Sequence, residues 1–233
     1  MWKHSRACLV VTTICVVLIS THAFAGGSWE VVRKEAGITV LQKDVPGRGL
    51  PIFKGRTVIH ANIYALLAIL QDVAQHKKWM HAVSESMEVD RDGDVLVTSY
   101  NRTEAPWPVS DRDVVIESRI SLDPKTHTIL VKFRSVTTSK KPEVDGVVRV
   151  PRLTGYYKFT ALTVSKTRVE YLVDVDPGGS LPDFIAREAS QDTPVNSLRN
   201  LRRRAGETVG DYKAFRDRWD PAVNADAPRI VPQ

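Results

Sequence analysis

The chain has 233 residues, a formal net charge of +6 and only two cysteines. Its 42% hydrophobic and 26% charged residues are ordinary globular values, which exclude a disordered or fibrous protein. Two cysteines cannot form a disulfide scaffold or a cysteine-based zinc site. The length fits about one domain at the usual ~150 residues each. The modest positive charge does not indicate a nucleic-acid partner.

Residues 1–25 have the pattern of a secretory signal peptide. Lys3 and Arg6 precede an uncharged apolar run over residues 7–20, and residues 23–25 (AFA) form the small-x-small pattern that signal peptidase accepts. The run is shorter than the ~20 residues that span a bilayer, and an uncleaved membrane anchor is the alternative. Cleavage after Ala25 would remove both cysteines, and it predicts a periplasmic or secreted protein.

The first half of the remaining chain indicates two strands followed by helices. Residues 38–41 and 51–60 have strand character, with a turn at residues 47–49. Asn62 is placed to cap a helix in which Ile63, Leu66, Leu67 and Leu70 follow the spacing of one buried face. A shorter helical piece is expected at residues 75–80.

The next hundred residues change to the period-two alternation of antiparallel strands. The predicted strands are 84–89, 95–102, 113–121, 128–136, 146–150, 156–162 and 168–175. In the stretch 112–120, the even positions are mostly apolar and the odd positions are mostly charged. Arg112 falls on the apolar face, so its guanidinium needs hydrogen-bond acceptors from the backbone, a carboxylate or a ligand head group.

A long helix is predicted after the Gly178-Gly179 break, with Pro182 at its first position. Phe184, Ile185, Val195, Leu198 and Leu201 form its apolar stripe, and Pro194 is expected to kink or split it. Residues 207–233 are expected to be a partly disordered C-terminal extension. Four arginines lie near the helix end, namely Arg199, Arg202, Arg203 and Arg204. Their positive charges interact favourably with the helix dipole, and the alternative is contact with an anionic membrane surface. The elements together predict an α+β domain whose sheet curls around this helix.

Motifs for common chemistries are missing from the sequence. It contains no nucleophile elbow, phosphate loop, dinucleotide turn or zinc-protease motif. The Asp90, Asp92, Asp94 triplet resembles a calcium loop, but Val95 and Asn101 stand where that loop needs glycine and glutamate. We therefore expect neither a metal nor a cofactor.

Four segments together resemble the START (steroidogenic acute regulatory protein-related lipid transfer) family. They are residues 105–113 (APWPVSDRD), residues 174–182 (DVDPGGSLP), residues 150–157 and Trp79 after the first long helix. The resemblance runs from about Trp29 to Gly206, so a START-like domain is predicted over residues 26–206. It implies a helix-grip fold, in which a curved antiparallel sheet wraps around a C-terminal helix and encloses an apolar tunnel. It also implies non-catalytic binding or transfer of a lipid or other apolar ligand.

One departure from the family bears on the ligand. In the sterol-carrying branch a buried acid and a buried arginine face each other, and these positions fall at Ser99 and Ser118 here. Both are neutral, which weakens a sterol assignment and leaves another apolar ligand open. Ser118 still offers a hydroxyl group.

The carrier hypothesis predicts which side chains line the tunnel. They are Trp79, Ser99, Arg112, Val114, Ile116, Ser118, Val131, Phe133, Tyr171 and Val173, with Phe184 and Leu198 closing it from the helix. One alternative is an SRPBCC-type cyclase or aromatase-like enzyme that acts on an apolar substrate, with Arg112, Tyr100 and His127 as candidate groups. Another is a structural domain with a filled core. Transient contact with an anionic membrane and a monomeric state are expected for the carrier.

Overall fold

The computed structural model describes residues 27–207 and 212–220. The predicted signal peptide, residues 1–25, lies outside the described residues, as does most of the predicted C-terminal extension. No helix in the described ranges is long and apolar enough to cross a membrane.

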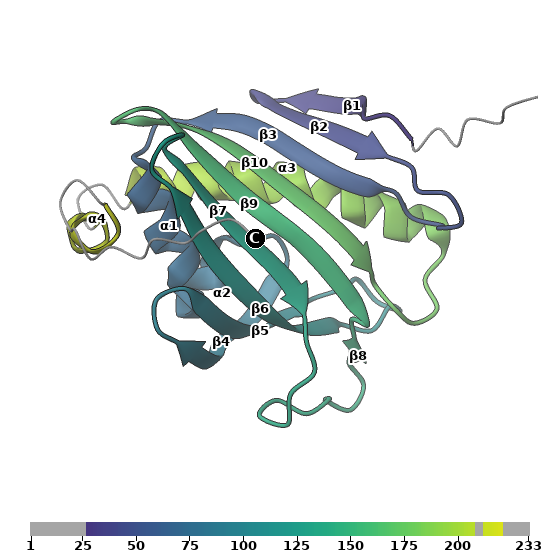
Figure 1. Ribbon diagram of the computed structural model, residues 1–233. Coiled ribbons are helices and arrows are strands. Elements are labelled where there is room, and N and C mark those ends of the chain that lie inside the picture. The colour runs from purple at the N-terminus through teal and green to yellow at the C-terminus, as the bar shows by residue number, and fades with distance from the viewer. Residues whose placement is uncertain (1–26, 208–211, 221–233) are drawn as a thin grey trace, which may run out of the picture.

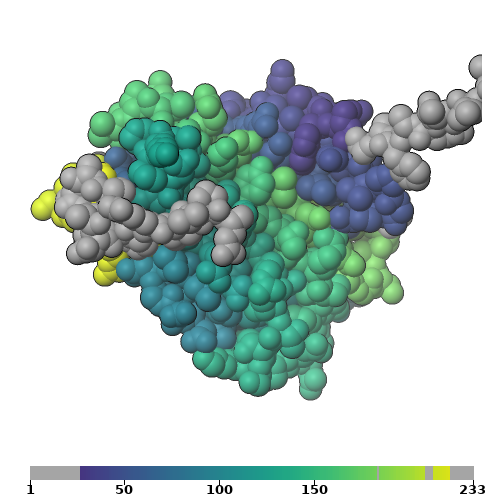
Figure 2. Space-filling model, in the orientation of Figure 1, coloured from purple at the N-terminus to yellow at the C-terminus, as the bar shows by residue number. Residues whose placement is uncertain are grey.

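A single curved sheet dominates the fold (Figure 1). Its strand order is β1-β2-β3-β10-β9-β7-β6-β5-β4, all antiparallel, while the short β8 pairs parallel with β6. Side chains fill the spaces between these ribbons on the outer face (Figure 2). The strands are β1 (Glu30–Glu35), β2 (Ile38–Lys43), β3 (Ile52–Ile59), β4 (Val83–Asp92), β5 (Leu96–Thr103), β6 (Arg112–Asp123), β7 (Thr128–Ser135), β8 (Val148–Arg149), β9 (Arg152–Thr163) and β10 (Lys166–Asp176).

The helices are α1 (Ile63–Gln71), the 3-10 turn η1 (Val73–Gln75), α2 (His76–Trp79), α3 (Asp183–Glu207) and α4 (Lys213–Trp219). α1, α2 and α3 lie on the inner, concave side of the sheet, and α4 lies at one end of it beside α1 (Figure 1). α1 begins as the sequence predicts, because the Asn62 side chain accepts a hydrogen bond of 2.8 Å from the Tyr64 backbone N–H.

The long helix α3 packs on β2 and β3 through its predicted apolar stripe. Val195, Leu198 and Leu201 are almost completely buried there. A Cβ atom at Gly55 would lie 2.6 Å from Leu198 Cδ1, so glycine is what allows this close approach. Pro194 does not split the helix, since α3 runs unbroken through it, and a kink at this position stays a prediction.

Two elements were not predicted from the sequence. β1 is an edge strand whose Val31 and Val32 are 53% and 37% exposed, so it lacks the alternation of a half-buried strand. α4 lies in the predicted extension and contacts α1, and its Trp219 side chain is fully buried. A packed helix therefore lies beyond α3, in the segment that the sequence analysis expected to be partly disordered.

Candidate functional site, a cavity between the sheet and the long helix

A cavity of about 540 Å³ lies between the concave face of the sheet and α3. This volume is within the range of about 300–1,000 Å³ typical of small-molecule sites. Its walls come from the central strands β5, β6, β7, β9 and β10, from the α1–α2 region and from one face of α3. Loops 104–109 and 177–181 complete one end, which we call the mouth.

Most of the residues that the sequence analysis placed on the tunnel wall line this cavity. They are Ser99, Arg112, Val114, Ile116, Ser118, Val131, Phe133, Tyr171 and Val173. Each occupies an inward position of a strand whose alternation the sequence displays. Their contact with a ligand stays a prediction.

Three predicted lining residues lie elsewhere, which corrects the sequence analysis. Trp79 is 1% exposed and packs in the core with its ring edge-on to His76, which lines the cavity in its place. Leu198 is buried against Gly55 on the sheet rather than in the cavity. Phe184 is 70% exposed, because it points outward from the first turn of α3.

The face of α3 that lines the cavity carries mainly small side chains. Five of the eight α3 residues that line the cavity are small, namely Ala186, Ala189, Ser190, Thr193 and Ser197, and the others are Ile185, Glu188 and Asp192. Most follow one another at steps of three or four residues, so they share one face of the helix. The sequence analysis followed the large apolar residues of α3, which mark packing against the sheet. A search for a small-residue stripe at helical spacing would have found the cavity face.

The β5 side of the cavity is polar. Ser99, Asn101 and Thr103 are alternate residues of β5 and all line the cavity. Asn101 and Thr103 were missed, although simple alternation from Ser99 identifies them. His76 lies on the same lining, and its Nε2 atom is 2.9 Å from the Leu70 carbonyl oxygen. Burial lowers the pKa of His76, so the ring is neutral near pH 7.

Two buried polar atoms near this wall, the Nδ1 atom of His76 and the Oδ1 atom of Asn101, lack a hydrogen bond of standard geometry within the described protein. The two side chains interact with each other, because a hydrogen bond with Asn101 acts on the pKa of His76. A bound polar group or water beside them would complete their hydrogen bonding. The polar wall is therefore able to hold a ligand with hydrogen-bonding groups.

The opposite side of the cavity, on β7, β9 and β10, is aromatic and aliphatic. Phe133, Tyr157 and Tyr171 lie together there, with tilted contacts between Phe133 and each tyrosine at 6.2 Å. Burial raises the pKa of Tyr171 to about 12 and that of Tyr157 well above its usual value, so both hydroxyls stay neutral. One wall of the cavity is thus polar and the other apolar, as an amphipathic ligand requires.

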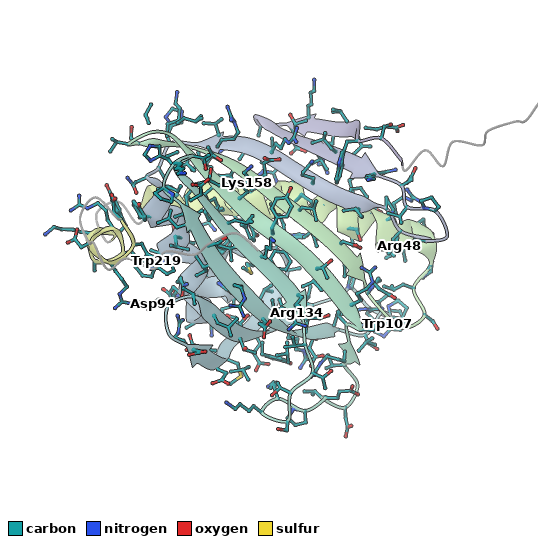
Figure 3. All side chains as sticks on the ribbon, viewed as in Figure 1. Arg48, Asp94, Trp107, Arg134, Lys158 and Trp219 are labelled. Carbon is teal, nitrogen blue, oxygen red and sulfur yellow. The ribbon has the colours of Figure 1, made fainter. Side chains whose placement is uncertain are left out.

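The mouth combines a pair of glycines in the left-handed backbone region with exposed apolar side chains. Gly178 and Gly179 both have positive φ values, of 65° and 66°, which favour glycine. Trp107, in loop 104–109, is 92% exposed, and Figure 3 shows it beside the loop that leads from β10 into α3. Exposed Phe184 begins α3 at the same end.

The candidate catalytic groups do not converge. Of the three, only Arg112 lines the cavity. Tyr100 is buried beneath Lys141, whose Nζ atom lies 3.9 Å from the ring centroid, and His127 lies in the turn after β6. Within residues 27–207 and 212–220, no cluster of three or more His, Cys, Asp or Glu side chains is arranged to hold a metal ion.

The arginines near the end of α3 have partners within the domain. Arg199 pairs with Glu35, and Arg202 donates to the Ala36 carbonyl oxygen at 2.7 Å. Arg203 and Arg204 pair with Glu207 at 2.9 and 3.5 Å. These contacts hold α3 to the β1–β2 turn and stabilise the helix end, and membrane contact by Arg199, Arg202, Arg203 and Arg204 stays a prediction.

Comparison with known proteins agrees with this geometry. Residues 16–209 match the START domain family. An uncharacterized protein of Pseudomonas aeruginosa is 32% identical over 174 residues, which cover 75% of this chain and 85% of that protein. The human phosphatidylcholine transfer protein is 28% identical over 186 residues, covering 78% of this chain and 85% of that protein.

Solved structures share the fold. The crystal structure of a STAR-related lipid transfer protein fragment from Xanthomonas axonopodis is 28% identical, with a TM-score of 0.70, and covers 76% of this chain and 98% of that one. Human STARD10 is 20% identical, with a TM-score of 0.69 over 90% of this chain and 86% of that one. The curved sheet around α3 is the helix-grip arrangement predicted from the sequence. The chain therefore belongs to the START domain family.

Proposed function

We propose that this protein binds one amphipathic lipid in the cavity and carries it without covalent chemistry. The observation that supports this most directly is the small-residue face of α3 opposite inward-facing strands, because it leaves a space that larger side chains would fill. Burial of acyl chains against the aromatic wall supplies binding energy of about 25 cal/mol per Å². The polar β5 wall then orients the ligand.

Family membership supports the same proposal. Relatives that share most of this chain's length are named as lipid transfer proteins, and one is named for phosphatidylcholine. We also propose that the protein acts in the periplasm or outside the cell, which rests on the signal pattern of residues 1–25.

Transfer needs contact between the mouth and a membrane. We propose that Trp107 and Phe184, the strongly exposed aromatic residues at this end, enter the membrane interface, where tryptophan is favoured. The arginines near the end of α3 lie about 15–20 residues beyond Phe184 along the helix. That distance is about 22–30 Å at 1.5 Å per residue, so the two candidate contact surfaces can be tested separately.

Native mass spectrometry of the purified full chain, with lipid extraction, tests the proposal. We expect one bound lipid molecule per protein. Ser190→Phe, on the cavity face of α3, should abolish lipid retention because the ring fills the space, while Arg187→Phe, on the exposed face, should retain it. A folded wild-type protein that carries no lipid and takes up no apolar probe would contradict the proposal.

A further inference from the structure

Arg112 is the only arginine or lysine among the described residues that line the cavity. The acids beside it in sequence are already paired with other arginines. Asp111 accepts from Arg102 at 2.7 Å, and Asp113 accepts from Arg149 at 2.6 Å. Within the described ranges Arg112 makes no ion pair, and its side chain donates only to the Ser110 carbonyl oxygen. Its Nε atom is buried and has no hydrogen-bond partner among the residues that the structure describes.

The remaining acidic groups around the cavity do not neutralise Arg112. Asp176 accepts a hydrogen bond of 3.1 Å from the Gly178 backbone, and Asp192 pairs with Arg33. Glu104 and Glu188 also line the cavity, but both side chains are exposed and therefore screened by solvent. The guanidinium of Arg112 therefore has hydrogen-bond donors that no described acceptor on the cavity side satisfies.

The position of Arg112 fixes where such an acceptor would lie. Arg112 begins β6 and pairs in register with Thr103 of β5, which also lines the cavity. A Cβ atom at Gly179 would lie 3.6 Å from its Nη2 atom, so the glycine loop at the start of α3 covers it. Arg112 therefore lies at the mouth, beneath the loop that must move if α3 opens.

Physical chemistry defines what this site can bind. A guanidinium presents five donors in a planar fork that matches the two oxygens of a carboxylate or phosphate. Desolvation lowers the pKa of Arg112, yet an arginine side chain stays protonated in proteins, so the positive charge persists in a partly dry site. A bound anion would satisfy the donors and offset that desolvation.

Given the proposed function, on which this inference rests, we propose that Arg112 binds the acidic group of the carried lipid. The group is a carboxylate or a phosphate, held at the mouth under Gly178 and Gly179, while the acyl part lies along Phe133, Tyr157 and Tyr171. The cargo is then an anionic or phosphate-bearing amphiphile rather than a neutral apolar molecule. This also accounts for a charged residue on a mostly apolar strand face.

Two matched ligand pairs test the assignment through displacement of a neutral fluorescent fatty-alcohol probe. The first pair is oleate and oleyl alcohol, and the second is dioleoyl phosphatidate and dioleoylglycerol. We expect the wild-type chain to bind the acidic member at least about tenfold more tightly. Preference in the first pair identifies a carboxylate, preference in the second identifies a phosphate, and either result supports the proposal.

Variants show whether Arg112 causes the preference. Arg112→Gln should abolish it without changing the affinity for the neutral members, and Arg112→Lys should retain part of it. Arg119→Gln removes the same charge from an exposed residue of the same strand that is off the cavity lining, so it should keep the wild-type preference. Thermal melting of each variant confirms that it is folded.

Equal affinity of the wild-type chain for both members of each pair would overturn the inference, as would an unchanged preference in Arg112→Gln. In either case, binding of the neutral probe would leave the proposed function standing. A folded wild-type chain that binds neither the probe nor any of the four ligands would instead contradict the proposed function itself.

Discussion

Tyr157 and Tyr171 are direct cross-strand partners on β9 and β10, and their rings stack with centroids 4.2 Å apart and planes 3° from parallel. Phe133 lies at 6.2 Å from both rings. These three side chains make the aromatic wall a preformed surface. An acyl chain can contact it without first ordering loose side chains, which lowers the entropic cost of binding.

Removal of one stacked ring tests this wall. Tyr171→Ala should lower the free energy of unfolding by about 3 kcal/mol or more, as large-to-small aromatic substitutions do. Tyr171→Phe keeps the ring, so it should cost about 1 kcal/mol. Urea denaturation measures both values. A similar loss in the two variants would contradict the view that stacking, rather than the hydroxyl group, carries the stability.

Gly155 fixes the position of Phe133. A Cβ atom at Gly155 would lie 2.1 Å from the Leu172 carbonyl oxygen and 2.5 Å from Phe133 Cζ. Gly155→Ala should therefore push the Phe133 ring toward the cavity, destabilise the protein by about 1–3 kcal/mol and weaken lipid binding. Gly206→Ala is the control, since nothing lies near its Cβ position, and it should be neutral or stabilising. Normal binding and stability in Gly155→Ala would refute this account.

Stability should fall in mild acid because of His76. Burial lowers its pKa below the ordinary value of 6.5, so the folded state holds the ring neutral while the unfolded chain binds a proton. Its contribution is complete above pH 6.5 and is lost as the pH falls toward the folded-state pKa. Burial lowers the pKa of His81 in the same way.

Denaturant titrations between pH 7.5 and about 5 measure this effect. The slope of stability against pH should flatten in His76→Gln and flatten further when His81→Gln is added. Unchanged slopes in both variants would show that other groups are responsible.

Opening of the mouth should require movement of the loop into α3. A Cβ atom at Gly179 would lie 3.5 Å from Val148 Cγ2, which suggests Val148→Cys with Gly179→Cys as a disulfide pair. We expect lipid exchange to slow at least about tenfold in the oxidised form. The reduced form of the same protein is the control, because it contains the same strain at position 179. Equal exchange rates in both forms would exclude this loop as the gate.

Vesicle-binding measurements distinguish the two candidate membrane-contact surfaces, at the mouth and near the C-terminal end of α3. Trp107→Ala should weaken binding to lipid vesicles several-fold, since an exposed indole is favoured in the interface. Arg203→Gln should change it little, because Arg203 already pairs with Glu207. Co-sedimentation at low and high salt gives both values. A loss confined to Arg203→Gln and to low salt would favour the arginines instead.

The sheet wall of the cavity was predictable because strand residues have only two faces. Once Val114 and Ile116 are assigned inward, Arg112 and Ser118 follow from the same period. The helix wall was harder to predict, because large apolar residues such as Leu198 mark close packing against the sheet. The cavity instead requires small side chains that leave space. Ala189 and Ser190 have no hydrophobic signal that would single them out.

The unpredicted elements lack the patterns on which such predictions depend. β1 is exposed on most of its length, so Val31 and Val32 do not alternate with polar residues in burial. α4 is short, and its burial depends mainly on Trp219, which contacts an element far away in sequence. Local sequence cannot show that a distant surface is available to cover such a residue.

The small side chains on α3 have a consequence for how this protein can diversify. Since Ala186, Ala189, Ser190, Thr193 and Ser197 border the empty space without building the sheet, each can gain or lose a few atoms while the strand pairing stays intact. The sizes of these side chains, on successive turns of one helix, thus help to determine the shape of the ligand that the cavity accepts. New lipid selectivities can arise there by one substitution at a time, without a new scaffold.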